Sequence, residues 1–219
     1  MRAALVTGVD RSRAIGHAIA RRLEAGGARV VTHGLGDGDL EVDIVADFAD
    51  PDAPARVIAA AAPLDTLVVN HTAEIIRPLG ELTAEQIDAH LHVNVRATLL
   101  LVQEFSAQFE GEAGAVVLLT SGAHRGPMTS NIAYAVSKGA LAIAAPTLSD
   151  ALADRGIRVN AINPGPTNTG YLDGVEPARM PTGRWGEPDD AARLVAWLCS
   201  DDGRWVTGQV IDSEGGFRR

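Results

Sequence analysis

The 219-residue chain is poor in cysteine, lysine and aromatic residues. Cys199 is the only cysteine, which excludes an internal disulfide and a cysteine-clustered metal site. Acidic residues outnumber basic ones by 28 to 19, and the net charge of −9 argues against partners such as nucleic acid or an anionic membrane. No uninterrupted apolar run reaches the roughly 18 residues of a membrane span, and MRAALVTG carries no export signal. The sequence therefore predicts a cytoplasmic protein of one domain.

Short β-type runs alternate with helical patterns along the whole chain. This alternation predicts an α/β fold with a parallel sheet between two layers of helices. Strands are expected at Ala3–Thr7, Arg29–His33, Val42–Val45, Thr66–Asn70, Ala115–Thr120, Arg158–Ile162 and Gln209–Asp212. Helices are expected where Ile15, Ala18, Ile19 and Leu23 recur at helical spacing, and over Ala53–Ala62, Thr83–Phe109, Ile132–Asp154 and Asp189–Cys199.

Two local signals refine this pattern. Thr83 and Gln86 form a capping box that marks the start of a long helix. Only GLGDGDLE separates the second and third expected strands, whereas a parallel crossover usually takes a dozen or more residues and a helix. We therefore expect the helix between these strands to be missing.

The segment LVTGVDRSRAIGHAIA leaves the first strand and enters the first helix. Backbone N–H groups and the helix N-terminus can hold a pyrophosphate at such a place. Gly8 is expected to make the tight turn and Gly16 to allow close approach of the helix. The spacing is not the standard G-x-G-x-x-G, so an ordinary strand-to-helix turn is the alternative.

Positive charge near this loop favours NADP(H) over NAD(H). The loop contains Arg11 and Arg13, and the second strand ends at His33 and Gly34 with no acidic residue until Asp37. NAD sites usually place an acid there for the ribose 2′-hydroxyl, whereas a 2′-phosphate needs cations. The alternative for both arginines is solvated loop charge.

Only one of the 19 basic residues, Lys138, is a lysine, and it stands four residues after Tyr134 in a predicted helix. With two tyrosines in the chain, a random lysine falls at this spacing in roughly 2 of 219 positions, about 1%. Both side chains project from one helical face, and an ammonium favours the phenolate, which makes a proton-transfer group usable near neutral pH. Ser121, at the end of the preceding strand, can hydrogen-bond a substrate carbonyl or alcohol.

With these motifs the chain resembles the short-chain dehydrogenase/reductase superfamily of classical type, from TGVDRSRAIG to WVTGQVIDSEGG. Among its branches it is most similar to carbonyl reductases such as 3-oxoacyl-acyl-carrier-protein reductase. The resemblance implies one NAD(P)-binding oxidoreductase domain over residues 1–219 and a Rossmann-type doubly wound parallel sheet of order 3-2-1-4-5-6-7. It also implies hydride transfer between the nicotinamide of NADP(H) and a carbonyl or secondary alcohol.

Residue by residue, the resemblance implies four catalytic roles. Tyr134 matches the acid/base, and Lys138 matches the partner that lowers its pKa and holds the nicotinamide ribose. Ser121 matches the serine that polarises the substrate, and Asn94 matches the asparagine that anchors a water for proton relay. The cofactor site then comprises Gly8, Arg11, Arg13, Ile15, Gly16, His33, Gly34, Asn70, Tyr134 and Lys138, with Asp47 beside the adenine, Pro164 and Gly165 at a bend near the nicotinamide, and Thr169 at its carboxamide.

The sequence departs from the family pattern in the cofactor loops. The glycine-rich turn carries two extra residues, and Ala14 replaces its middle glycine. A methyl group there reduces the room for the pyrophosphate. After the fourth strand the usual Asn-Asn-Ala-Gly reads Val69-Asn70-His71-Thr72, so only Asn70 matches.

The expected partner is a small carbonyl or alcohol substrate, free or carried on an acyl carrier protein. Its pocket is expected to draw apolar surface from Met128, Tyr171, Leu172 and Trp185, and polarity from His71, His124 and Arg125. The histidines show no paired spacing, so no metal is implied. The resemblance also implies a homodimer or homotetramer.

Two other functions remain as alternatives. A non-catalytic NADP(H)-binding regulatory protein of the same fold has no need for all four catalytic groups. Enoyl reductases space the tyrosine and lysine more widely, and extended epimerases are much longer, so both fit this sequence less well.

Overall fold

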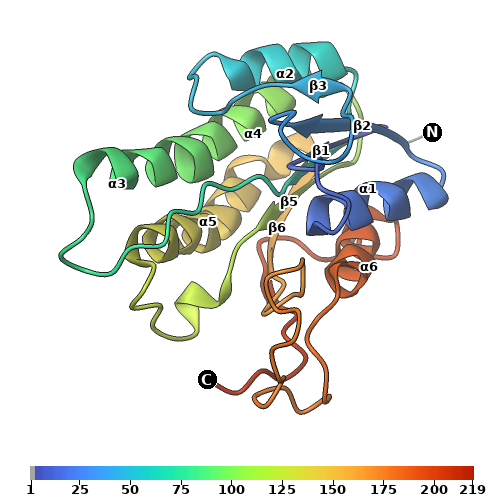
Figure 1. The fold of residues 1–219 in the computed structure, drawn as a ribbon. Coiled ribbons are helices and arrows are strands. Elements are labelled where there is room, and N and C mark those ends of the chain that lie inside the picture. Colours follow the sequence, from blue (N-terminus) through green and yellow to red (C-terminus); the bar gives the residue numbers. More distant parts are fainter. Residues whose placement is uncertain (1–2) are drawn as a thin grey trace.

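The computed structural model describes residues 3–219, which form a seven-stranded parallel sheet of order β3-β2-β1-β4-β5-β6-β7 (Figure 1). Every paired strand runs parallel to its neighbour. The strands are β1 (Ala3–Thr7), β2 (Arg29–Gly34), β3 (Ile44–Val45), β4 (Thr66–Val69), β5 (Gly114–Leu119), β6 (Ile157–Asn163) and β7 (Val210–Asp212). The predicted fold class and strand order are confirmed.

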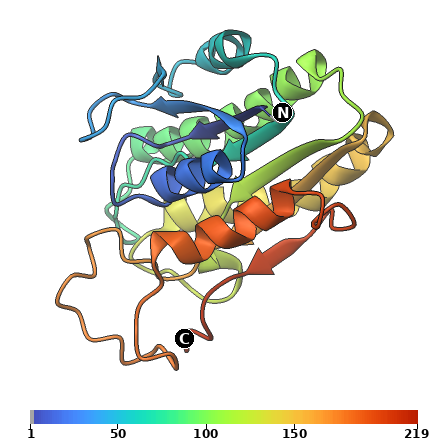
Figure 2. The same ribbon diagram turned by 90° about the vertical axis from the view of Figure 1, so that its right-hand side faces the viewer.

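Helices cover both faces of the sheet (Figure 2). Helices α1 (Ile15–Ala25) and α6 (Pro188–Cys199) lie on one face, and α2 (Ala53–Ala61), α4 (Ala97–Gln108) and α5 (Ile132–Ala151) lie on the other. Successive strand residues face opposite layers, so Leu5 of β1 joins the core under α2, α4 and α5 while Val6 joins the core under α1 and α6. Burial on both faces explains why these strands lack polar alternation.

The connection between β2 and β3 contains no helix in the described structure, as predicted. The expected strand Val42–Val45 shrinks to Ile44–Val45, which pairs with His33 and Gly34. Asp43 instead accepts hydrogen bonds at 2.8 Å from the backbone N–H and hydroxyl of Thr32. Without a crossover helix, the connection lies along the end of the sheet that faces the phosphate loop.

The expected helix Thr83–Phe109 is interrupted by a π-helical turn. The capping box of Thr83 and Gln86 is present and starts α3 (Ala84–His90). The π-helical turn η1 (Leu91–Arg96) follows and leads into α4. Helical periodicity in the sequence does not distinguish a π turn from an α turn. Such turns are frequent at functional sites, and this one carries Asn94.

Helix α5 is long and apolar enough to cross a membrane by length and composition alone. It nevertheless packs against β6 and buries Ser137, Lys138 and Ser149. Buried polar side chains beside a sheet are features of a core helix. The helix ends at Ala151, short of the predicted Asp154, where a 3₁₀ turn begins at Ala153.

Substitution of Phe105 tests how much the core beneath α4 contributes to stability. Its side chain is fully buried, so Phe105→Ala is expected to lower the free energy of unfolding by about 3–5 kcal/mol through lost burial and a residual cavity. Leu79, which is 82% exposed, is the matched control, with an expected change of about 0.5 kcal/mol or less for Leu79→Ala. Urea denaturation measures both. Equal losses in the two variants would contradict the packing described for Phe105.

Candidate active site

The loop between β1 and α1 forms a cradle for a phosphate group. Gly8 has a φ of +71°, which favours glycine, and its carbonyl accepts a hydrogen bond from Asn70 Nδ2 at 3.0 Å. A Cβ on Gly16 would lie 2.2 Å from the Gly8 carbonyl oxygen, so only glycine fits there. Ala14 provides no side-chain cap for α1, whose first turn begins at Ile15 and contains no acid. The open N-terminus fits an anionic diphosphate.

Asp10 places a carboxylate at the carboxyl end of β2. Its Oδ2 accepts hydrogen bonds from the backbone N–H groups of Leu35 at 2.8 Å and Gly36 at 3.1 Å. Gly34 lies directly against it, because a Cβ there would be 2.6 Å from Asp10 Cγ. Along the sequence, the first acidic residue after β2 is Asp37. In the structure, however, the phosphate loop places the Asp10 carboxylate at the end of β2.

The residues predicted near the adenosine ribose, Arg11, Arg13 and His33, differ in the positive charge that they bring to it. His33 is buried against Phe48, with ring centroids 4.2 Å apart, and burial lowers its pKa to about 4. His33 therefore brings no positive charge at neutral pH. The Arg11 guanidinium is exposed and lies 3.6 Å from the Asp37 carboxylate. Arg13 donates two hydrogen bonds, at 2.7 and 2.8 Å, to the carboxylate of Asp173 in the loop after β6.

The other expected cofactor residues lie in loops at the carboxyl ends of the strands. Asp47 Oδ1 accepts the backbone N–H of Ala49 at 2.8 Å and so shapes its own turn. Pro164, Gly165 and Thr169 follow β6 and are half-buried. Their backbone forms part of the same edge of the sheet as the phosphate cradle, which is the ligand-binding edge of doubly wound folds.

Four predicted catalytic residues meet at this edge. Ser121 follows β5, and its hydroxyl acts on the Tyr134 phenol by lowering the pKa of that phenol. The Lys138 ammonium lies 6.0 Å from the centre of the Tyr134 ring and donates a hydrogen bond at 2.9 Å to the Leu119 carbonyl. Asn94 contacts the same helix through Ser137 Oγ, at 2.9 Å from its Nδ2.

The electrostatics of Tyr134 differ from the expectation based on Lys138. Burial and the Glu74 carboxylate raise the pKa of Tyr134 above its ordinary value, and the Ser121 hydrogen bond only partly opposes them. Burial also lowers the pKa of Lys138 to about 8, against an opposing effect of Glu74. Spacing predicted a lowered pKa for the phenol, whereas the structure favours a phenol that stays protonated at neutral pH.

Asn94 fixes the backbone that follows β4. Its Oδ1 accepts the Ala73 N–H at 2.7 Å and its Nδ2 donates to the Ala73 carbonyl at 2.9 Å. The Asn94 carbonyl accepts the Thr98 hydroxyl at 2.7 Å. Full burial of Asn94 makes each of these bonds costly to lose.

Two buried histidines fix the same loop. His71 Nε2 donates to the Val93 carbonyl at 2.9 Å, and its Nδ1 accepts the Thr7 hydroxyl at 2.9 Å. His90 Nε2 accepts the Ile75 N–H at 3.1 Å. Burial lowers the pKa of His71 to about 3. The expectation that His71 adds polarity to a substrate pocket is therefore wrong, because the side chain is buried and ties the loop to η1.

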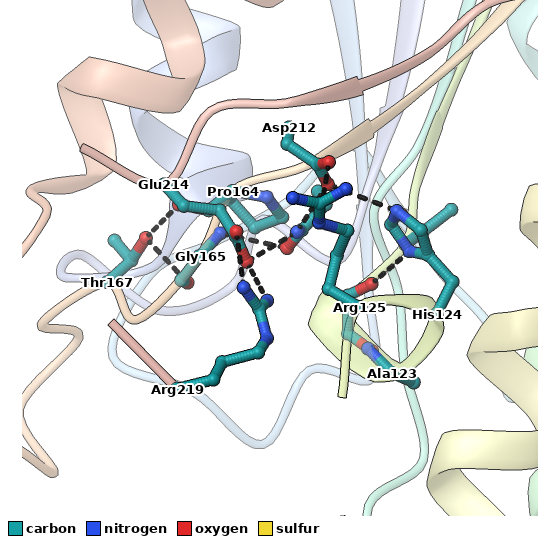
Figure 3. Close-up of polar contacts among 12 residues, drawn as sticks. Ala123, His124, Arg125, Pro164, Gly165, Thr167, Asp212, Glu214 and Arg219 are labelled. Carbon is teal, nitrogen blue, oxygen red and sulfur yellow. Dashed lines mark hydrogen bonds and ion pairs between the residues drawn. The ribbon is translucent and has the colours of Figure 1, made fainter. Parts of the chain in front are cut away.

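A cluster of charged residues lies beside the loop after Ser121 (Figure 3). The Asp212 carboxylate contacts His124 Nε2 at 3.1 Å and Arg125 Nε at 3.3 Å. Glu214 pairs with Arg219, near the C-terminal end of the described chain, and accepts a hydrogen bond from Asn163. His124 and Arg125 were candidates to meet a substrate carboxylate. The structure pairs both with a carboxylate of the chain itself.

Residues 3–219 hold no group of three or more His, Cys, Asp or Glu side chains arranged to bind a metal ion.

Comparisons with known proteins agree with this geometry. A family model described as enoyl-(acyl carrier protein) reductase matches residues 8–218. L-xylulose reductase of Bos taurus is 30% identical over 236 residues, which cover 99% of this chain and 96% of that protein. A blue fluorescent protein from a metagenomic library, solved in complex with NADPH, is 32% identical, has a TM-score of 0.91 and is matched over 100% of this chain and 98% of that one. A short-chain dehydrogenase from Burkholderia cenocepacia, solved in complex with NADP, is 36% identical with a TM-score of 0.87, over 98% of this chain and 97% of that one.

The family match spans nearly the whole chain, and the sheet order, the phosphate cradle and the Tyr134–Lys138 spacing all lie within it. The chain belongs to the short-chain dehydrogenase/reductase superfamily and is an NAD(P)-dependent oxidoreductase that transfers hydride between a nicotinamide and a carbonyl or secondary alcohol carbon.

Proposed function

We propose that residues 1–219 form one oxidoreductase domain in which Tyr134 is the acid/base for reduction of a carbonyl compound by NADPH. The observation that carries this proposal is the meeting of Ser121, Tyr134 and Lys138 at the edge of the sheet that holds the phosphate cradle. When bound, NADPH supplies the hydride. Gly8, Gly16 and the N-terminus of α1 would hold its diphosphate.

The raised pKa of Tyr134 suits its role as an acid. A phenol that remains protonated can donate to an alkoxide, which is a far stronger base than a phenolate. The Ser121 and Tyr134 hydroxyls together can hold the carbonyl oxygen as charge develops on it. The Lys138 ammonium stabilises the resulting phenolate, and Asn94 positions Lys138 by holding Ser137.

Cofactor preference is the second part of the proposal. NADP(H) is supported by the complexes of the two similar structures with NADPH and NADP and by the exposed Arg11 guanidinium in the phosphate loop. Asp10 is the opposing feature, since its carboxylate occupies the backbone N–H groups of Leu35 and Gly36 at the end of β2. Arg11 would bind the 2′-phosphate and Asp10 would limit that affinity.

Assembly into a homodimer or homotetramer is supported by apolar side chains exposed on the outer helices. Leu99 of α4 is 42% exposed, and Val136 and Ile143 of α5 are 60% and 74% exposed. Large exposed apolar side chains on adjacent helices favour association. The cytoplasmic location and a carrier-bound substrate stay predictions from the sequence.

The regulatory alternative is not favoured. A protein that only binds NADP(H) needs the cradle but not a phenol 6.0 Å from a buried ammonium. The similar proteins also include a named reductase.

Tyr134→Phe is expected to lower kcat/KM for carbonyl reduction by about 100-fold or more, because it removes the proton donor and keeps the ring. Steady-state kinetics with NADPH measure the loss, and fluorescence titration is expected to show nearly unchanged NADPH binding. Tyr171→Phe removes the only other phenol and is expected to lose far less. Full turnover by Tyr134→Phe would exclude Tyr134 as the acid.

Lys138→Arg tests whether the ammonium itself is needed. We expect a loss of about 100-fold in kcat, because the planar guanidinium does not fit the buried site and keeps its proton, whereas the Lys138 pKa lies at about 8. Circular dichroism and NADPH titration check that the variant is folded. Wild-type turnover by Lys138→Arg would show that the reaction does not require a lysine at this position.

Asp10→Asn tests the ribose end of the cofactor site. The change keeps an oxygen acceptor for the Leu35 and Gly36 N–H groups and removes the charge. We expect KM for NADPH to fall several-fold while KM for NADH changes little or rises, because a carboxylate repels the 2′-phosphate. An equal change in both KM values would show that Asp10 does not influence the preference between NADPH and NADH.

A further inference from the structure

Glu74 is a carboxylate in the loop after β4 whose charge acts on Tyr134 and Lys138. Both of its neighbours along the chain are held, since Asn94 bonds the N–H and carbonyl of Ala73 and His90 accepts the N–H of Ile75. Glu74 therefore extends from a fixed stretch of backbone, although its own side chain is exposed.

Asn131 orients the Glu74 carboxylate toward the catalytic helix. Its Nδ2 donates to Glu74 Oε1 at 3.0 Å, and Asn131 is the residue just before α5, one turn ahead of Tyr134. The Asn131 side chain is buried, and its Oδ1 has no hydrogen-bond partner in the described part of the chain. The hydrogen bond to Glu74 is thus the side-chain hydrogen bond that Asn131 makes, so the buried amide fixes the carboxylate.

The charge of Glu74 reaches the reacting groups. It raises the pKa of Tyr134 and of Tyr171, and it opposes the lowering of the pKa of Lys138. Two side chains of α5 and one of the loop after β6 thus feel the charge of the same carboxylate.

The cations around the site do not offset this charge. Arg125 pairs with Asp212, Arg219 with Glu214 and Arg13 with Asp173. Among residues 3–219, no arginine or histidine forms an ion pair with Glu74. Glu74, whose charge acts on Tyr134 and Lys138, therefore has no ion pair with an arginine or histidine among the described residues.

We infer that Glu74 is a substrate-recognition residue whose carboxylate accepts a hydrogen bond from a hydroxyl or ammonium group close to the reacting carbonyl and disfavours substrates with a carboxylate there. The inference rests on the proposed function, because the carbonyl must be held by Ser121 and Tyr134 for the neighbouring substituent to meet Glu74. It assigns the substrate class as carbonyl compounds with a nearby hydrogen-bond donor.

Four small methyl ketones test this assignment with the intact enzyme. Butan-2-one, hydroxyacetone, aminoacetone and acetoacetate differ only in the group next to the CH₂ beside the carbonyl, which is methyl, hydroxyl, ammonium or carboxylate. We measure kcat/KM for each ketone with NADPH and with NADH. Comparing hydroxyacetone with aminoacetone then shows whether Glu74 favours a hydroxyl or an ammonium as the hydrogen-bond donor.

Glu74→Gln is the informative variant, since it removes the charge and keeps an oxygen for Asn131. We expect kcat/KM to fall about tenfold for hydroxyacetone and more for aminoacetone, to rise about tenfold for acetoacetate, and to stay nearly constant for butan-2-one. Glu81→Gln is the control, because it removes an exposed acid from the same segment between β4 and α3. It is expected to leave kcat/KM unchanged for all four ketones.

The outcomes separate the two proposals. If the wild-type enzyme reduces these ketones without preference, or if Glu74→Gln changes all four alike, the assignment of Glu74 is wrong while the carbonyl reductase function stands. If the wild-type enzyme reduces none of them with either cofactor, the result counts against the proposed function and the inference together.

Discussion

The buried Asn94 amide holds the active site together. It bonds both backbone groups of Ala73 and the hydroxyl of Ser137, and so joins the loop after β4, the π-helical turn and helix α5. Asn94 lies within the π-helical turn. Lys138 follows Ser137 directly, so the position of the ammonium depends on a side chain more than 40 residues earlier in the chain.

The other polar groups of the candidate site are either buried and neutral or paired with an opposite charge of the same chain. His33 and His71 are uncharged at neutral pH because they are buried, and Asp212 and Glu214 neutralise the cations beside the Ser121 loop. Burial also dominates the pKa shifts of Tyr134 and Lys138. In such surroundings one carboxylate or ammonium has a larger effect than it would have in water.

Much of the fold could be predicted from the sequence, and so could the candidate catalytic set that we propose, because apolar runs, a short connection and the Tyr134–Lys138 spacing are local signals. The features that were missed depend on distant contacts. Asp10 acts through N–H groups some 25 residues later, and Glu74 through Asn131, 57 residues away. The π turn keeps the apolar periodicity of an α-helix, and the raised pKa of Tyr134 follows from burial, which spacing does not report.

The single lysine has a consequence for the surface of the protein. Lys138 is 3% exposed, so the folded chain presents its positive charge to solvent through guanidinium groups and offers no lysine amine. Reagents and modifying enzymes that attack side-chain amines meet no target on the folded domain. Reaction of Lys138 with such a reagent would instead report the opening of the catalytic helix.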